Sequence, residues 1–157
     1  DRLSAPQRLF LGDLPLVAEM DDLLFVHASP QEPDDWTYIL SESDAADGLA
    51  ATGARAVFCG HVHRAALYSR DMAGKVAAHR FAMGLPVPLL KSRRWLAVLG
   101  SVGQPRDGSG LANYAIYDAT ANELTFRRIG YDSALTARKI RSAGLPENLA
   151  ARLVQGV

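Results

Sequence analysis

The sequence predicts one α/β (α+β) domain over residues 1–157, in which a βαβ unit is followed by a run of strands and two closing helices. Two observations carry this prediction. Residues 23–59 have the order strand, helix, strand, which is typical of two parallel strands joined by a helical crossover. Residues 64–129 then hold short apolar stretches separated by turns and no convincing helix, which favours antiparallel strands.

The charge balance and the cysteine content narrow the class of protein. The chain has 17 Lys+Arg and 17 Asp+Glu, and this neutrality argues against a nucleic-acid-binding face or a membrane-surface patch. No apolar run approaches the roughly 20 residues that a membrane-spanning helix needs. Cys59 is the single cysteine, so no intrachain disulfide is possible. Because the sequence also lacks a signal-peptide pattern, we expect a reducing, cytoplasmic location.

The first predicted elements are a short helix and two strands. Ser4 is placed to cap a helix that runs to Leu11 and is broken by Pro15. The candidate buried residues of this helix are Leu3, Leu9 and Phe10. Residues 16–19 and 23–27 then predict two strands joined by a turn.

The βαβ unit continues with a helix and a buried strand. The helix is expected over residues 43–52, with Ser43 as its cap and Gly53 as a left-handed residue at its end. The continuous apolar run 56–59 is typical of a strand covered on both faces. A right-handed crossover would set this strand parallel to the strand at 23–27, with both carboxyl ends at one edge of the sheet.

The second half of the chain predicts five further strands and two helices. The strands are expected at 66–70, 75–82, 95–99, 114–118 and 124–129. The clearest hairpin joins 114–118 to 123–129, where Leu124 and Phe126 alternate with polar residues and predict one buried face. The last two helices are predicted from Ser133 to Gly144 and from Pro146 onward.

Three of the four histidines follow the predicted buried strands directly. His27 ends the apolar run 23–26, while His61 and His63 follow the run 56–59 after a glycine. Parallel strands bring their carboxyl ends to one edge of a sheet, and neutral imidazole is the commonest metal ligand, so this edge is predicted to hold a metal. For His27 alone, ligand and structural residue are equally good interpretations. His79 lies within a strand pattern and is interpreted as structural.

Cys59 stands next to these histidines and is a second kind of candidate ligand. Because it precedes the turn and lies within an apolar strand, we interpret it as a buried thiol rather than a metal ligand.

Three sequence segments together resemble a known enzyme family. They are Val26-His27-Ala28, Gly60-His61-Val62-His63 and the loop from Gly100 to Asp107. In combination they are similar to the C-terminal portion of a calcineurin-like metallophosphoesterase, of the bacterial serine/threonine phosphatase or diadenosine tetraphosphatase-related type. The resemblance implies part of a four-layer αββα sandwich with mixed and antiparallel strands. It also implies a dinuclear centre of Mn, Fe or Zn, with His27 and His61 on the second metal and His63 on the first.

The family motifs that should precede these segments are absent from this chain. They are Asp-x-His, Gly-Asp and Gly-Asn-His-Asp, and in the family they supply the bridging carboxylate, an asparagine ligand and the histidine acid. Gly12-Asp13 does occur, but at the end of a predicted helix rather than after a buried strand. We therefore expect this chain to be a C-terminal portion whose N-terminal strands are missing, with no catalytic acid of its own and little activity alone.

The function implied by the resemblance is hydrolysis of a small phosphoester substrate at two metals. Arg106 is a candidate substrate-binding residue, because a guanidinium can hold two phosphate oxygens; a surface ion pair with Asp107 is an equally good interpretation. Two alternatives stay open, namely a non-catalytic interaction scaffold and a mononuclear zinc hydrolase that uses only these histidines. We also expect either a missing N-terminal segment or self-association to cover apolar surface and sheet edge.

Overall fold

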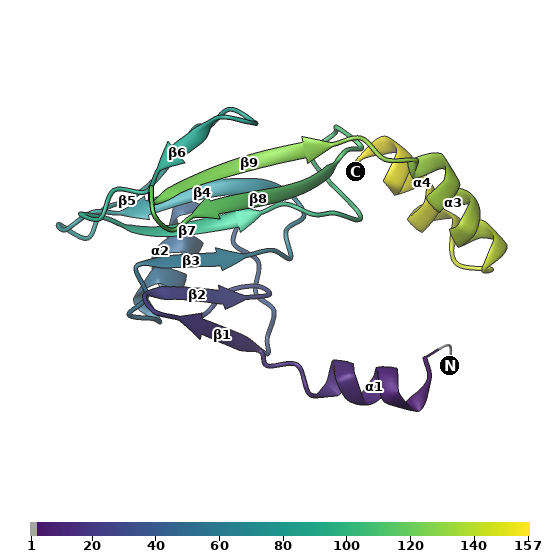
Figure 1. Cartoon of the computed structure of the whole chain (residues 1–157), viewed down its shortest axis with the longest axis horizontal. Helices are drawn as coiled ribbons and strands as arrows, with labels where there is room; N and C mark the ends of the chain where they lie inside the picture. Colours follow the sequence, from purple (N-terminus) through teal and green to yellow (C-terminus); the bar gives the residue numbers. More distant parts are fainter. Residues whose placement is uncertain (1–2) are drawn as a thin grey trace.

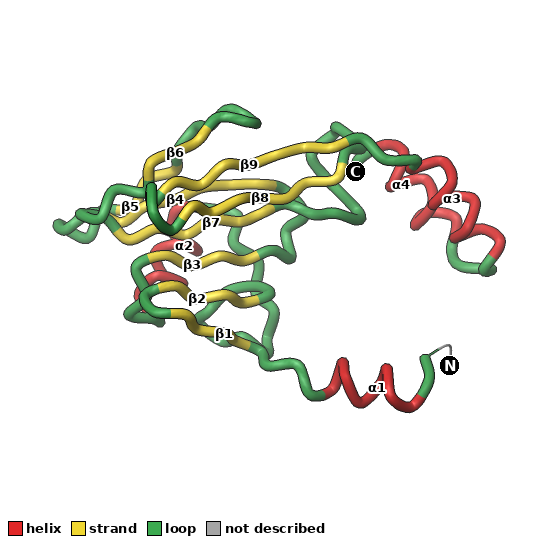
Figure 2. Tube along the Cα trace, in the orientation of Figure 1, coloured by secondary structure: helices red, strands yellow, loops and turns green. Residues whose placement is uncertain are grey.

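The computed structural model describes residues 3–157 and contains two sheets and four helices in that range (Figures 1 and 2). The helices are α1 (Ala5–Gly12), α2 (Glu42–Ala50), α3 (Ser133–Ser142) and α4 (Glu147–Gln155). The strands are β1 (Val17–Met20), β2 (Leu23–Val26), β3 (Ala56–Cys59), β4 (Ala65–Arg70), β5 (Val76–Ala78), β6 (Pro86–Pro88), β7 (Arg94–Leu99), β8 (Ala112–Asp118) and β9 (Glu123–Ile129).

The larger sheet has six strands in the order β1-β2-β3-β7-β4-β5. Strands β2 and β3 pair in parallel with Phe25 opposite Phe58, which confirms the predicted βαβ unit. The expectation of purely antiparallel strands after residue 64 is wrong at one position. Strand β7 lies between β3 and β4 and pairs in parallel with β3, so it extends the buried centre of the sheet.

Helix α2 begins at Glu42, and its cap is Ser41, two residues before the predicted cap Ser43. The Ser41 Oγ accepts the backbone N–H of Asp44 at 3.2 Å, and the Asp44 carboxylate accepts the N–H groups of Leu40 and Ser41. These bonds satisfy N–H groups that a helix start leaves unpaired. The end was also predicted wrongly: Ala51 closes the helix in the right-handed region, and Gly53 does not adopt a left-handed conformation.

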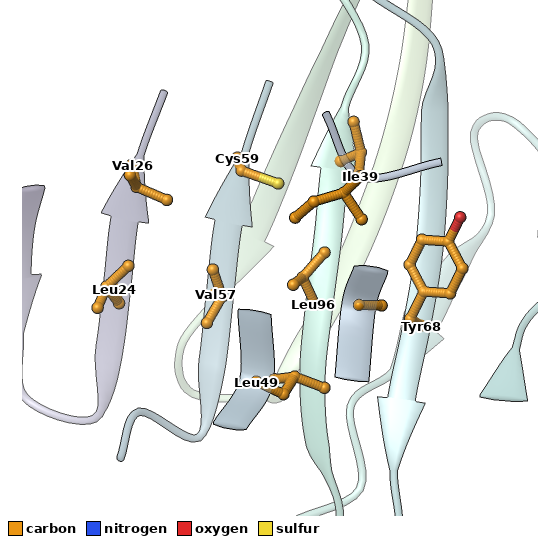
Figure 3. Close-up of a cluster of buried hydrophobic side chains, with 10 residues drawn as sticks. Leu24, Val26, Ile39, Leu49, Val57, Cys59, Tyr68 and Leu96 are labelled. Carbon is orange, nitrogen blue, oxygen red and sulfur yellow. The ribbon is translucent and has the colours of Figure 1, made fainter. Parts of the chain in front are cut away.

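Two apolar clusters on opposite faces of the large sheet form the core. On one face, Ala45 and Leu49 of α2 pack with sheet residues such as Val57 and Leu96 (Figure 3). On the other face, Leu124 and Phe126 of β9 pack against the large sheet, each 1% exposed. The alternation predicted for this strand is therefore confirmed. Burial on both faces explains why β3 is apolar throughout.

The described residues form three layers, a helix and two sheets, where the resemblance implied part of a four-layer sandwich. Helices α3 and α4 do not cover the outer face of the second sheet. They pack on each other beyond the end of β8 and β9 (Figure 1). Asp132 rather than Ser133 caps α3, accepting the Leu135 N–H at 2.7 Å.

The second sheet has the order β6-β9-β8, and its β8–β9 hairpin agrees with the prediction. Strand β6 was not predicted, because its sequence carries prolines at both ends and proline cannot donate to a sheet ladder. It occupies the edge of the sheet, where a missing N–H is tolerated.

Helix α1 forms where expected but buries none of its residues. Ser4 caps it, with its N–H bonded to Gln7 Oε1 at 2.8 Å. Leu9 and Phe10, which were predicted to be buried, are 67% and 65% exposed. Figure 1 shows the reason: α1 stands apart from both sheets, so its apolar residues have no surface to pack against. None of the helices within residues 3–157 is long and apolar enough to cross a membrane.

His79 occupies a structural environment, as interpreted from the sequence. Its Nε2 lies 2.7 Å from the hydroxyl of the fully buried Ser69, which also accepts a hydrogen bond from Arg93 at 3.1 Å. Its ring lies 5.0 Å from that of Trp95. Burial first, and then the charge of Arg93, lowers the pKa of His79 below its ordinary value.

This lowered pKa predicts a loss of stability in mild acid. Between the folded-state pKa and the ordinary value of 6.5, the unfolded chain binds more protons, so the free energy of unfolding falls as the pH drops through that window. We expect the melting temperature to fall as the pH decreases from about 7.5 to about 5.5, and His79→Gln, which cannot titrate, to show a shallower fall. Because the pKa of His61 is lowered too, part of the slope persists in the variant. Superimposable profiles of the two proteins would contradict this assignment.

Candidate metal centre

Two loops at one edge of the large sheet carry the predicted ligands. His27 follows the last residue of β2, and His61 and His63 follow β3 after Gly60. The parallel pairing of the two strands places both exits side by side. The backbone N–H of Gly60 donates to the carbonyl of His27 at 2.9 Å, so the two loops are joined to each other.

His27 and His61 come together at this edge. Their ring nitrogens, Nε2 of His27 and Nδ1 of His61, are 2.9 Å apart. Two aromatic side chains enclose the pair: the ring of Trp36 lies 4.6 Å from that of His27, and the ring of Tyr38 stacks on His61 at 4.3 Å with an interplanar angle of 20°. This packing limits rotation of both imidazoles.

His63 is held by a different contact. Its Nδ1 lies 2.6 Å from the backbone carbonyl oxygen of Gln104. A carbonyl can only accept, so Nδ1 carries the proton and the lone pair of the neutral ring is on Nε2. A histidine whose second nitrogen donates to a carbonyl is typical of metal ligands, because that bond fixes the tautomer and the ring orientation.

The backbone at these two histidines is strained. His61 and His63 have φ values of 61° and 63°, in the left-handed region that residues other than glycine seldom adopt. Such conformations cost of order 1–3 kcal/mol each and cluster at functional sites. The surrounding contacts therefore hold both residues in backbone conformations that are unfavourable in the unfolded chain.

The electrostatics of the site favour neutral imidazole. Burial lowers the pKa of His61, and positive charge on His27, His63 and Arg106 lowers it further. A neutral ring keeps a lone pair for a cation at pH values where an isolated histidine would already be partly protonated.

The histidines fit a metal as a partial ligand set. Nitrogens bound to one ion at about 2.1 Å are roughly 3–3.5 Å apart, close to the His27–His61 separation. Within residues 3–157, however, no group of three or more His, Cys, Asp or Glu side chains is close enough together to hold an ion. His63 influences the pKa of His61 but does not complete such a group. A metal ion bound by His27 and His61 would therefore need further ligands from outside the described residues.

Cys59 is not available as one of those ligands. It is 3% exposed, and its Sγ lies 3.7 Å from the Ala97 carbonyl. Burial raises the pKa of the thiol to about 12, whereas metals bind the thiolate. The interpretation of Cys59 as a buried apolar thiol agrees with this environment.

Arg106 lies near the histidines but not in the ion pair considered for it. Its backbone N–H donates to the carbonyl of His63 at 3.0 Å. Asp107 pairs instead with Arg128, at 2.8 Å. The Nε of Arg106 is buried and has no hydrogen-bond partner among the described residues, so its donor is unsatisfied.

Sequence reasoning missed the residues that shape the site around the histidines. Trp36 and Tyr38 follow the polar loop after His27, and large aromatic residues in such a loop were the signal for them. No signal pointed to Gln104, because its contribution is a backbone carbonyl.

An apolar cavity of about 820 Å³ adjoins His27. Its walls come from the end of α1 and the segment that follows it, from β1, β2 and β3, and from β8. Residues on these walls include Leu11, Leu14, Phe25, Phe58 and Tyr114. Several are large apolar side chains that remain more than a third exposed.

Two known proteins are similar to this chain, one in sequence and one in structure. No model of a known protein family matches the sequence. An uncharacterized protein of Methanocaldococcus jannaschii is 33% identical over 151 residues, which are 94% of this chain and 58% of that protein. The crystal structure of a metallophosphoesterase from Sphaerobacter thermophilus matches with a TM-score of 0.88 and 34% identity, over 99% of this chain and 65% of that one. This chain has the fold of a metallophosphoesterase.

The likeness shows the fold, while membership of the calcineurin-like superfamily remains what the sequence motifs imply. The phosphatase or diadenosine tetraphosphatase subtype stays a prediction. The chain spans 58% of the length of the Methanocaldococcus protein and 65% of the length of the Sphaerobacter protein. About two fifths of the first and about a third of the second therefore lie outside the match.

The left-handed backbone of His63 predicts that glycine is a more stable replacement than alanine at this position. At a positive φ, alanine costs about 1 kcal/mol more than glycine. Because both substitutions remove the same imidazole, we expect His63→Gly to be more stable than His63→Ala by about that amount in urea unfolding. His79, whose φ is not positive, serves as the control: there the alanine variant is expected to be the more stable one. The same order at both positions would contradict the strained geometry.

Proposed function

We propose that this chain supplies the histidine ligands of a metal-dependent phosphoester hydrolase. One observation carries the proposal: His27 and His61, 34 positions apart in the sequence, present ring nitrogens 2.9 Å apart at the joined exits of two parallel strands. The same edge belongs to a fold shared with a metallophosphoesterase.

In this proposal His27 and His61 bind one of two divalent ions, Mn, Fe or Zn, and His63 binds the other. The bridging carboxylate and the histidine acid come from polypeptide outside these 157 residues, in keeping with the greater length of the matched proteins. Bound divalent ions would supply a hydroxide at neutral pH and neutralise charge on the phosphoryl group.

The residues of this chain prepare the site for that chemistry. Burial and nearby positive charge lower the pKa of His61 and so favour its neutral form. His63 keeps its Nε2 lone pair outward because Gln104 takes the proton of Nδ1. Trp36 packs against the ring of His27, and Tyr38 stacks on the ring of His61. The guanidinium of Arg106 can donate hydrogen bonds to phosphate oxygens. The proposed substrate is a small phosphoester.

The geometry gives little support to a mononuclear zinc hydrolase built from this chain alone. Such a site needs three protein ligands around one ion. The described residues hold no group of that size. A centre shared with additional ligands is therefore the better proposal.

The first test is metal binding by the purified chain. We expect Zn²⁺ or Mn²⁺ to bind, and His27→Ala or His61→Ala to weaken binding about tenfold or more, since each removes one of two paired nitrogens. Competition with a chromophoric chelator measures the affinity. His79→Ala is the matched control and should bind like the parent. Equal affinities in all four proteins would contradict the proposed ligands and favour a scaffold without metal.

The second test is catalysis by the protein that carries these residues together with the remaining ligands. We expect His61→Ala or His63→Ala to abolish hydrolysis of an aryl phosphate ester, with an unchanged circular dichroism spectrum, because a ligand is lost while the core is intact. His79→Ala is expected to retain turnover at a lower melting temperature. Near-normal turnover in either ligand variant would refute the assignment.

We further propose that polypeptide covers the apolar cavity beside His27. In the intact enzyme a segment outside these residues would fill it; in the purified chain a second copy takes its place. The exposed side chains of Leu11 and Leu14, each 51% exposed, lie on its wall and form part of the surface to be covered.

This proposal predicts concentration-dependent self-association of the purified chain. Analytical ultracentrifugation should show dimers or larger species, and the double substitution Leu11→Ser with Leu14→Ser should shift them toward monomer by removing apolar contact area. Met72→Ser is the control, because Met72 is 92% exposed and does not line the cavity. A monomer at every concentration would count against a cavity that requires a cover.

A further inference from the structure

A second cavity is lined by three arginines, one of which, Arg64, directly follows His63 in the sequence. Its volume is about 660 Å³, and its walls include Arg64, Arg106 and Arg128 together with Asp107. We call this the arginine pocket. The four residues come from the loop after β3, the long loop before β8, and β9. Only the fold brings these charges together.

Asp107 carries the one side-chain carboxylate among these four residues, and its charge is balanced by Arg128. Asp107 Oδ2 accepts from Arg128 at 2.8 and 3.0 Å, and its Oδ1 accepts the N–H and hydroxyl of Ser109. Burial opposes the charged form of Asp107, but the Ser109 hydrogen bonds and the charge of Arg128 outweigh it and lower its pKa. Asp107 is thus a fixed partner of Arg128 and leaves the other two arginines uncompensated.

Arg64 and Arg106 form no ion pair with any carboxylate of the described residues. The Nε and Nη2 of Arg64 donate to the backbone carbonyl of Arg106 at 3.3 and 3.2 Å, which positions the guanidinium without cancelling its charge. The Nε of Arg106 is buried and donates to nothing. A buried donor without an acceptor is unfavourable, and an anion whose oxygen accepted its hydrogen bond would remove that cost.

The wall opposite the arginines is fixed by the end of α4. Gly156 caps this helix with a φ of 71°, and its carbonyl accepts the N–H of Gly108 at 2.9 Å. A Cβ at Gly156 would lie 2.7 Å from the backbone nitrogen of Gly110, so only glycine allows the helix end to approach the loop this closely. The pocket is therefore bounded by packed backbone.

The arginine pocket adjoins the proposed metal centre. Arg64 follows His63 directly in the sequence, and the backbone of Arg106 is bonded to the carbonyl of His63. A phosphate group held there would lie next to a phosphoryl group held at the histidines.

We propose that the arginine pocket binds a phosphate group of the substrate other than the one that is hydrolysed. This inference rests on the proposed function and narrows it to phosphoesters that carry a second phosphate. Arg64 and Arg106 are the recognition residues, because their planar guanidinium groups match phosphate oxygens and have no competing carboxylate.

The first experiment titrates the purified chain with inorganic phosphate in the presence of EDTA, followed by calorimetry or NMR. Removal of metal separates the pocket from the histidine centre. We expect saturable binding that Arg106→Gln and Arg64→Gln each weaken about tenfold, since each removes a charge-assisted contact. Arg64 is exposed, so its substitution keeps the fold if that of Arg106 does not.

Two control variants locate the binding site. Arg141→Gln removes an arginine of α3 that pairs with Glu147 outside the pocket, and should bind phosphate like the parent. His61→Ala should also bind like the parent, because the metal is absent. Unchanged affinity in both Arg64→Gln and Arg106→Gln would overturn the proposal, and so would a loss confined to His61→Ala.

The second experiment distinguishes a substrate phosphate from free phosphate. With Zn²⁺ present, propane-1,3-diol bisphosphate should bind about tenfold more tightly than the monophosphate, and Arg64→Gln should erase this advantage. Equal affinities for the two esters would overturn the substrate class. Should the metal proposal itself fail, Zn²⁺ would not bind through His27 and His61, yet the EDTA titration would still show the dependence on arginine.

Discussion

The site depends on one backbone interaction, the hydrogen bond from Gly60 to the carbonyl of His27. It continues the parallel pairing of β2 and β3 beyond the last ladder residues, so the two loops leave the sheet together rather than diverging. Strand β3 is buried along its whole length between β2 and β7, which gives the loops a rigid base. The closeness of His27 and His61 is thus a consequence of sheet register, and a slip of one residue would separate them.

The local conformations at this edge are unfavourable by themselves. His61 and His63 both occupy the left-handed region, and the pKa of His61 is lowered because the site disfavours its charge. Stacking by Tyr38 and the carbonyl of Gln104 hold the two rings in place against these costs. A fold under selection for stability alone would relieve such strain with glycine. Strain that persists beside two paired histidine side chains is what a preorganised binding site requires.

The sequence was informative where the signal is local. The run 56–59 matches β3, and the hairpin 114–118 with 123–129 matches the pairing of β8 with β9, because short apolar stretches bounded by turns need no distant partner to be recognised. The burial of α1 was predicted wrongly, since its apolar residues reveal nothing about whether a surface exists to receive them. The place of β7 and the aromatic residues around His61 depend on contacts between distant segments, which periodicity does not encode.

The charges at this edge explain why the fold alone does not make a complete centre. Neutral imidazoles bring no negative charge, while Arg64 and Arg106 add two cations that no carboxylate in the described residues balances. Two divalent ions placed here would face net repulsion unless carboxylates entered from elsewhere, because metal sites of hard or borderline cations rely on anionic ligands. In the proposed function, such carboxylates come from outside the described residues, and the uncompensated arginines bind the phosphate groups of the substrate. The positive charge that disfavours cations at this edge also favours anions there, and this is the physical basis for proposing a substrate with more than one phosphate.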